Sequence, residues 1–361
     1  MRAAVLRQQP GWLELEDVVI ASPLRREVLI RVAAAGVCHS DFHIMNGDIP
    51  WPRPVVMGHE SAGTVEAIGD DVTYVGVGDR VTVCEYNCGH CRMCLTGRSH
   101  WCDARAAGQR GVDEAPRLTS ISGDAISAFA QRGSFAEFML VHEDAVVKLP
   151  DGMPFAQAAL VSCAVMTGAG AVFNTAQVRP GETVAVIGCG GIGLNAVQAA
   201  AFSGAARVVA IDRVASKLEL ARQLGATDVV DASAVDPVEA IRDLTGGGVD
   251  HAFEAIGLRS TAEQAWQMLR RRGTATICGV LPAGQSVELD AQSLTSEKRL
   301  QGSFLGSGRY RVDMPFIMEM YLQGRYKLDE LISRRVPLDA VNDSFRALET
   351  GEVARSVIEF S

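Results

Sequence analysis

The pattern of apolar and polar positions changes character near residue 167. Before that point, short runs with strand-like composition are separated by glycine and proline, and few stretches repeat with a helical period. This pattern predicts a mainly β region over residues 1–160. Its expected strands are Ala3–Leu6, Glu27–Ala34, Ala62–Ile68, Arg80–Val83 and Phe138–Val141.

From Thr183 onward, apolar runs of strand length alternate with segments of helix length. The first unit is a strand at Val184–Ile187, a glycine-rich turn and a helix at Ile192–Phe202. The same order repeats as far as a strand at Thr274–Val280. Repeated βα alternation predicts an α/β fold with a doubly wound parallel sheet, because right-handed crossovers return each strand beside the last.

The segment after Ser307 changes again. It contains two expected helices, Met314–Leu322 and Leu338–Leu348, and an expected strand, Val357–Phe360, which we assign to the first domain. A chain of 361 residues is long enough for two cores. We therefore expect residues 1–164 and 306–361 to form the mainly β domain and residues 165–305 to form the α/β domain.

Charge and hydropathy exclude several classes of protein. A net charge of −9 argues against a nucleic-acid partner, since such proteins present basic faces. The longest apolar runs, such as Ala196–Ala201, are too short to cross a membrane, and the N-terminus lacks the order of a signal peptide. These observations predict a cytoplasmic protein with no membrane partner.

A glycine motif follows the first strand of the α/β region. The sequence Gly188-Cys189-Gly190-Gly191-Ile192-Gly193 fits the dinucleotide-binding pattern and opens the next expected helix. The glycines permit a tight turn, close approach of the backbone to a pyrophosphate and close packing of helix on sheet. A structural glycine turn is the alternative, but the strand–turn–helix context favours a cofactor.

The cofactor's identity depends on the next strand end. Asp212 lies nineteen positions after Gly193, where a carboxylate accepts hydrogen bonds from the adenosine ribose and repels a 2′-phosphate. This position predicts NAD rather than NADP. Arg213, beside it, is the feature that favours a phosphate instead.

Four cysteines cluster within fifteen residues. Cys88, Cys91, Cys94 and Cys102 have the spacing C-x2-C-x2-C-x7-C, and four thiolates can close a tetrahedral shell around a structural Zn²⁺. An iron–sulfur cluster is disfavoured by the last spacing and by the absence of a following proline. A nucleic-acid zinc ribbon is disfavoured by the acidic charge.

A second set of metal-binding residue types is dispersed along the chain. Cys38, His59 and Cys163 offer two thiolates and one imidazole, which would leave the fourth position of a zinc ion open. From spacing alone this indication is weak, because an isolated buried cysteine is usually a packing residue.

Together these motifs resemble the zinc-containing medium-chain alcohol dehydrogenases, over essentially the whole chain. The resemblance implies a GroES-like catalytic domain beside a Rossmann domain, and two zinc ions per chain. It assigns Cys38, His59 and Cys163 to the catalytic zinc. Cys163 favours the alcohol dehydrogenase branch over the polyol dehydrogenases, which typically have a glutamate there.

The resemblance also implies roles for other residues. Ser40 would bond the substrate alcohol, and His43 would relay its proton to solvent by way of the nicotinamide ribose. Asp41 and Glu60 would support the zinc and its histidine, and a helix cap is the less favoured alternative for Asp41. The implied cofactor contacts beyond the glycine loop and Asp212–Arg213 are His39, Thr167, Lys217 and Arg355.

Three features depart from the usual pattern of the family. His39 stands where many members have a phosphate-contacting arginine, which suggests weaker cofactor binding. Cys84, with Tyr86 nearby, aligns with an aromatic wall of the substrate pocket. Ala104–Gly133 is a long insertion that resembles the dimeric members, and the apolar segment Leu300–Leu305 would pair across a twofold axis. We therefore expect a homodimer.

The expected function is transfer of hydride between an alcohol and NAD, with a primary alcohol and its aldehyde favoured as the small-molecule substrate pair. A thiol-adduct-dependent formaldehyde dehydrogenase is an alternative that needs basic residues at the pocket mouth, for which Arg105 and Arg110 are candidates. A non-catalytic dinucleotide sensor is an alternative of another class, and it would lack the catalytic zinc.

Overall fold

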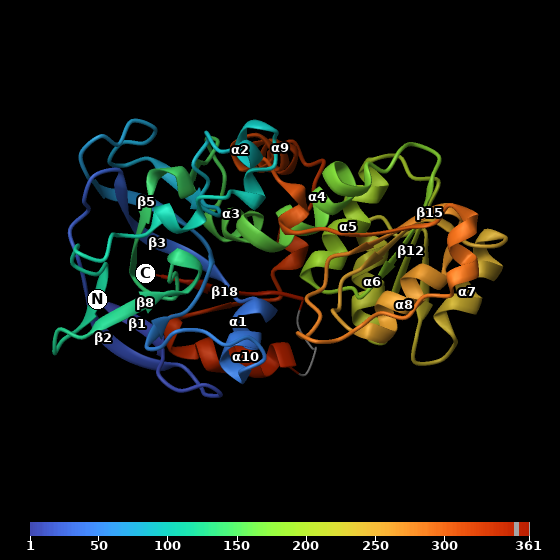
Figure 1. Cartoon of the computed structure of the whole chain (residues 1–361), viewed down its shortest axis with the longest axis horizontal. Coiled ribbons are helices and arrows are strands. Elements are labelled where there is room, and N and C mark those ends of the chain that lie inside the picture. Colours follow the sequence, from blue (N-terminus) through green and yellow to red (C-terminus); the bar gives the residue numbers. More distant parts are fainter. Residues whose placement is uncertain (350–353, 361) are drawn as a thin grey trace. The chain divides into compact units, whose positions relative to one another are not determined.

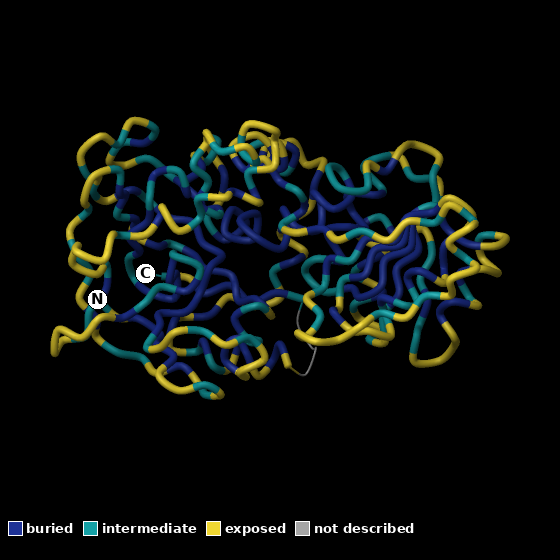
Figure 2. Tube along the Cα trace, in the orientation of Figure 1, coloured by how far each residue is buried: buried dark blue, intermediate teal, exposed yellow. Residues whose placement is uncertain are grey.

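The computed structural model describes residues 1–349 and 354–360. The chain forms two compact units, one made of Met1–Cys163 with Arg309–Ser361 and the other of Ala164–Gly308 (Figure 1). The boundaries expected from the sequence fall at 164/165 and 305/306. Figure 2 shows that the buried residues gather on the strands inside each unit.

The first unit contains two β structures. A closed barrel is formed, in order, by β1 (Arg2–Leu6), β2 (Glu14–Ile20), β7 (Leu118–Ser120), β8 (Ala125–Ala128) and β4 (Val55–Val56). The larger sheet has the order β10 (Val146–Lys148), β6 (Arg80–Val83), β5 (Glu60–Ile68), β3 (Glu27–Gly36), β18 (Ser356–Glu359) and β17 (Arg334–Val336), with β9 (Phe138–His142) also paired to β3.

The larger sheet explains why the C-terminal segment belongs to this unit. Strand β18 pairs antiparallel with β3, so Val357 lies opposite Gly36. Helices α9 (Tyr310–Leu322) and α10 (Val341–Glu349) precede β18 in the same unit. Phe345 of α10 and Ile30 of β3 are both fully buried in one hydrophobic core, so the end of the chain helps to build the domain in which it begins.

The second unit is a six-stranded parallel sheet. Its order is β13 (Asp228–Asp231), β12 (Arg207–Asp212), β11 (Thr183–Ile187), β14 (Val249–Glu254), β15 (Leu269–Ile277) and β16 (Arg299–Gly302). Read in chain order this is 3-2-1-4-5-6, the doubly wound arrangement of dinucleotide-binding domains. The connecting helices are α5 (Gly191–Phe202), α6 (Ala215–Gln223), α7 (Pro237–Thr245) and α8 (Arg259–Gln267). The expected fold class is confirmed.

Sequence patterning missed one long helical segment. Residues Phe155–Ala176 are helical, with π-helical stretches at Val161–Val165 and Ala171–Ala176. This segment is long and apolar enough to cross a membrane by composition, with a mean hydropathy of 1.6, but 94% of its apolar window is buried within the protein. A helix that is covered on all sides carries no amphipathic period, and this explains why the pattern did not reveal it.

Part of the expected insertion forms strands of the barrel. Ala104–Gly133 contains β7 and β8, which complete the barrel. Two of its arginines, Arg110 and Arg117, donate hydrogen bonds to Glu27 at the start of β3, and all three side chains are at most 11% exposed. The segment is therefore anchored to the central strand of the larger sheet by a buried cluster of charges.

Candidate metal centres and cofactor loop

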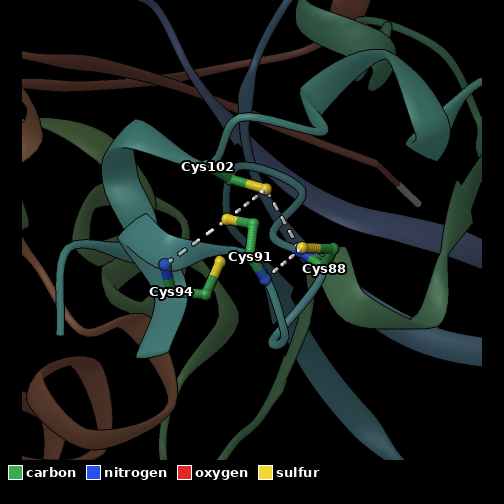
Figure 3. A group of neighbouring side chains, drawn as sticks. All are labelled: Cys88, Cys91, Cys94 and Cys102. Carbon is green, nitrogen blue, oxygen red and sulfur yellow. Dashed lines mark hydrogen bonds between the residues drawn. The ribbon is translucent and has the colours of Figure 1, made fainter. Parts of the chain in front are cut away.

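The four clustered cysteines converge in space. Each offers a sulfur, and the sulfurs of Cys88, Cys91, Cys94 and Cys102 all lie within 4.8 Å of one another and point inward (Figure 3). All four are free thiols. Cys91 is the N-cap of helix α2 (Arg92–Leu95) and Cys94 lies within the helix, so two of the sulfurs sit on one helical turn.

Backbone amides complete this site. The N–H of Cys88 donates to Cys102 Sγ, and the N–H of Cys91 donates to Cys88 Sγ, both at 3.3 Å. Hydrogen bonding from the backbone N–H of Cys94 lowers the pKa of the Cys91 thiol to about 6. Four mutually close sulfurs, three of which accept hydrogen bonds from backbone N–H groups, fit a structural Zn²⁺.

A second group of four ligand atoms lies in the core of the same unit. Cys38, His59, Glu60 and Cys163 are all buried, and their ligand atoms lie within 4.8 Å of one another. Cys38 is the residue before helix α1 (His39–Asn46), His59 precedes β5, and Cys163 lies in the π-helical stretch. Three segments that are distant in sequence thus meet at one point.

Two glycines make this convergence possible. A Cβ atom on Gly36 would lie 2.2 Å from the Glu60 carboxylate, and one on Gly58 would lie 2.6 Å from the Phe135 ring. Gly58 also has a φ of 92°, which favours glycine. Any larger residue at these positions would displace His59 or Glu60.

Asp41 orients the histidine. Its Oδ1 accepts hydrogen bonds from His59 Nδ1 and from the Gly58 N–H, each at 3.1 Å. A carboxylate can only accept, so Nδ1 carries the proton and Nε2 is left for a metal. Burial opposes the charged form of His59, but Asp41 and Cys38 outweigh it and raise its pKa well above the ordinary value.

The sulfurs of Cys38 and Cys163 interact directly. A hydrogen bond from the Cys163 thiol lowers the pKa of Cys38 well below its ordinary value and raises that of Cys163 well above it. One proton between two buried sulfurs is what a divalent cation would displace. With one imidazole and two sulfurs as ligands, and with the Glu60 carboxylate paired to Arg355 instead, the donor set fits Zn²⁺ with an open fourth position.

Glu60 and Arg355 form a buried pair behind these ligands. Arg355 Nη1 lies 3.3 Å from Glu60 Oε1 and donates to the Val37 carbonyl at 2.9 Å. Burial raises the pKa of Glu60 to about 8, although Arg355 opposes the shift. Arg355, which the resemblance assigned to the pyrophosphate, is therefore held beside the metal ligands in this structure.

The expected proton-relay residues lie along α1. Ser40 Oγ is 3.7 Å from Cys38 Sγ, and His43 lies one helical turn farther along, on the same face. The Nδ1–H of His43 donates to Asp48 at 2.8 Å. Asp48 was not predicted from the sequence. Gly47 could have indicated it, because this glycine ends the helix in a left-handed conformation (φ 86°) and turns the chain back onto the helix. His39, beside Ser40, is exposed.

The glycine loop of the second unit has the geometry expected for a dinucleotide. Gly188 has a φ of 92°, a Cβ on Gly193 would lie 1.7 Å from the Gly188 carbonyl oxygen, and Gly190 faces open space. Helix α5 begins directly afterward, at Gly191-Ile192, and its first N–H groups favour an anion.

Asp212 holds this loop from the end of β12. Its Oδ2 accepts from the Cys189 N–H at 2.7 Å, and its Oδ1 accepts from the Arg213 and Val214 N–H groups. Oδ1 already accepts two hydrogen bonds, whereas Oδ2 accepts one and has room for a second donor, so a ribose hydroxyl is compatible with this arrangement at Oδ2. Arg213 is exposed, Lys217 is half-buried in α6, and Thr167 is buried in α4 (Met166–Gly170).

The arginines proposed for a thiol adduct are occupied. Arg110 is only 7% exposed and bonds Glu27 and the carbonyls of Ala115 and Ser22. Arg105 donates to the His100 carbonyl and lies over the Trp101 ring. Neither guanidinium is arranged as a free basic group.

Two domain families match the chain. The alcohol dehydrogenase GroES-like domain matches residues 25–151, and the zinc-binding dehydrogenase domain matches residues 191–319. The chain belongs to the zinc-containing medium-chain dehydrogenase/reductase family. It is an oxidoreductase that acts on alcohols or their carbonyl partners.

Individual relatives cover the whole chain. An NDMA-dependent alcohol dehydrogenase of Amycolatopsis methanolica is 38% identical over 100% of this chain and 99% of its own length. Benzyl alcohol dehydrogenase of Acinetobacter calcoaceticus superposes with a TM-score of 0.94, at 32% identity and over 100% and 99% of the two chains. A putative zinc-binding dehydrogenase of Sinorhizobium meliloti, bound to NADP, has a TM-score of 0.84, at 30% identity and over 99% of both chains.

Proposed function

We propose that the protein is a zinc-dependent alcohol dehydrogenase that interconverts a primary alcohol and its aldehyde with NAD as the hydride carrier. The observation that carries this proposal is the buried meeting of Cys38, His59 and Cys163, with Asp41 fixing the histidine. A group of this kind fits a zinc ion with one open position. The four-cysteine site would hold the second zinc ion.

The chain's own residues support a proton path. When bound, zinc supplies a Lewis acid for the alcohol oxygen and NAD supplies the hydride acceptor. Ser40 would accept a hydrogen bond from the substrate hydroxyl. His43 would take the proton farther out through Nε2, because Asp48 keeps Nδ1 protonated. Cys38, His59 and Cys163 are at most 8% exposed, and this burial would limit the access of water to the reacting oxygen.

The electron acceptor is the open part of this proposal. Asp212 supports NAD over NADP, whereas one structural relative is bound to NADP and one sequence relative is NDMA-dependent. Activity should therefore be measured with NAD, NADP and NDMA in parallel. We expect the protein to oxidise primary alcohols with NAD. Turnover with NDMA as the only added acceptor, and none with NAD, would show that NAD is not an acceptor that leaves the enzyme. The cytoplasmic location stays a prediction.

The metal test separates the enzyme from a dinucleotide sensor. We expect two zinc ions per chain in protein purified without added metal. Cys163→Ser should lose about one zinc ion and the activity, whereas Cys278→Ser, at a buried cysteine in neither metal group, should keep both. Retention of activity by the Cys163 variant would overturn the assignment, and one zinc ion in the wild type would favour the sensor.

A further inference from the structure

The loop that follows helix α1 carries the partner of the expected relay histidine. Asp48, which accepts from the His43 Nδ1–H at 2.8 Å, lies between Gly47 and Ile49. Two backbone bonds return this loop to the helix, from the Gly47 N–H to the Ile44 carbonyl at 3.1 Å and from the Ile49 N–H to the His43 carbonyl at 3.3 Å. Asp48 is exposed, so its position depends on how this short loop is held.

A side chain from a distant segment holds the same loop. Gln9 lies between β1 and β2, and its Nε2 group donates to the carbonyls of Ile44 and Ile49, at 2.5 and 2.7 Å. An α-helix leaves its last carbonyls without their usual helical partners, and the Ile44 carbonyl lies in the last turn of α1. One amide group therefore ties the end of the helix to the residue that follows Asp48.

The oxygen of the Gln9 amide holds the far half of the loop. It accepts from the Trp51 N–H at 3.3 Å and from Arg53 Nη1 at 3.1 Å. The Trp51 ring meets the Phe129 ring edge-on, with centroids 4.9 Å apart, and Phe129 meets the ring of the candidate metal ligand His59 in the same way, at 5.5 Å. The loop that Gln9 holds therefore borders the candidate catalytic site as well as the relay.

We propose that Gln9 is a positioning residue for the proton relay: its amide fixes the loop Gly47–Arg53 so that the Asp48 carboxylate stays on His43 Nδ1. Two carbonyls face its Nε2 group and two N–H donors face its Oε1, and a carboxamide is the group that satisfies all four. With Asp48 in place, Nδ1 keeps its proton and Nε2 is available to accept the proton of the alcohol. This inference rests on the proposed alcohol dehydrogenase function and adds a residue that acts through another.

Gln9→Met and Gln9→Glu test this role. Methionine keeps the length of the side chain and removes all four bonds, whereas glutamate keeps an acceptor for Arg53 and loses the two donated bonds. We expect both variants to lower the single-turnover rate of NADH formation by about threefold to tenfold, the size of one neutral hydrogen bond. The alcohol concentration that gives the half-maximal rate should not change, and added imidazole should restore part of the loss.

A double-mutant cycle separates a role in the relay from a general contribution to the fold. If Gln9 acts through Asp48, Gln9→Met should cost nothing further in an Asp48→Asn background, because the contact that it preserves is already weakened. Gln8→Met, at the exposed neighbouring residue, is the matched control and should equal the wild type. A double variant in which the two losses multiply, or a Gln9→Met protein as fast as the wild type, would overturn the proposal.

An NMR measurement on protein with ¹⁵N-labelled histidine keeps the test independent of turnover. The His43 Nδ1–H resonance is identified by its disappearance in His43→Gln. We expect this proton to exchange slowly with water in the wild type and in Gln8→Met, and faster in Gln9→Met.

The two measurements separate this inference from the proposed function. Oxidation of alcohols, with no change of the exchange rate in Gln9→Met, would refute the positioning role while the function stands. Faster exchange in Gln9→Met, in a protein that oxidises no alcohol, would refute the function while Gln9 still positions Asp48. Fast exchange in the wild type would contradict the positioning role, because Asp48 would then not hold the proton.

Discussion

Ser40 and His43 lie three residues apart on α1 and therefore share a face, but their expected roles differ. Ser40 would touch the substrate oxygen, so Ser40→Ala should remove most hydride transfer while zinc content and NAD affinity persist. His43 acts farther out, where water or buffer can substitute. General acid–base steps contribute about 10²–10⁴-fold, so His43→Gln should cost less than that and be partly rescued by imidazole.

Asp48 extends this prediction, because it holds the Nδ1–H of His43. Asp48→Asn should reproduce part of the His43→Gln loss and respond to imidazole in the same way. The readout is single-turnover NADH formation for each variant, with Asp17→Asn, at an exposed residue of strand β2, as the control. A His43→Gln enzyme equal to wild type at every pH, with His39→Ala inactive, would move the relay to His39.

Asp212 should decide the cofactor. Its carboxylate repels a 2′-phosphate, so kcat/KM should favour NAD over NADP by at least roughly tenfold, about 1.4 kcal/mol. Asp212→Asn keeps the shape and removes the charge, and the ratio should fall. Asp231→Asn, at the end of the neighbouring strand β13, is the matched control. Equal efficiency with both cofactors in the wild type would mean that Arg213 overrides the carboxylate.

At the scale of elements, Glu27 couples β3 to the segment that completes the barrel. Burial opposes ionisation of Glu27, but hydrogen bonds from Arg110, the Leu24 N–H and Arg117 outweigh it and lower its pKa. A lowered pKa in the folded state contributes stability above the unfolded pKa, near 4.3, and this is lost as pH falls through the folded value.

Glu27→Gln should therefore destabilise the protein by about 3–5 kcal/mol at neutral pH, because two buried arginines lose their carboxylate. The difference from wild type should shrink below about pH 4. Denaturant unfolding at several pH values provides the measurement. Glu66→Gln is the control, since it breaks the exposed Arg31–Glu66 pair and should cost at most about 1 kcal/mol. Similar losses for both variants would contradict the anchoring role.

At the scale of the whole molecule, β16 is the edge strand of the parallel sheet. Leu300 on this strand is 39% exposed and Phe304 just beyond it is 38% exposed. An unpaired edge strand that exposes apolar side chains invites pairing with a second copy, so we expect a homodimer. Leu300→Glu should shift light scattering toward a monomer, and Leu244→Glu, at an equally exposed leucine of the same unit, should not. A monomeric wild type at micromolar concentration would refute the pairing.

Much of the architecture follows from the sequence by itself. Motifs that act on the nearby backbone could be predicted from the sequence. The glycine loop after Val184–Ile187 requires its glycines because the local backbone leaves no room for a side chain. The C-x2-C-x2-C spacing places sulfurs on one turn of chain. The βα alternation likewise predicted the parallel sheet, because each unit obeys local periodicity. The dispersed ligands Cys38, His59 and Cys163 became interpretable only through resemblance, since nothing local links them.

Tertiary structure alone decided where buried charges go. Arg110, Arg132 and Arg355 have the sequence signature of surface residues, and each instead meets a buried or half-buried carboxylate from a distant segment: Glu27, Glu85 and Glu60. The largely apolar helix Phe155–Ala176 escaped the pattern for the related reason that burial on every side removes periodicity. Partners far apart in sequence leave no local trace, so the pairing of these groups is a property of the packed fold.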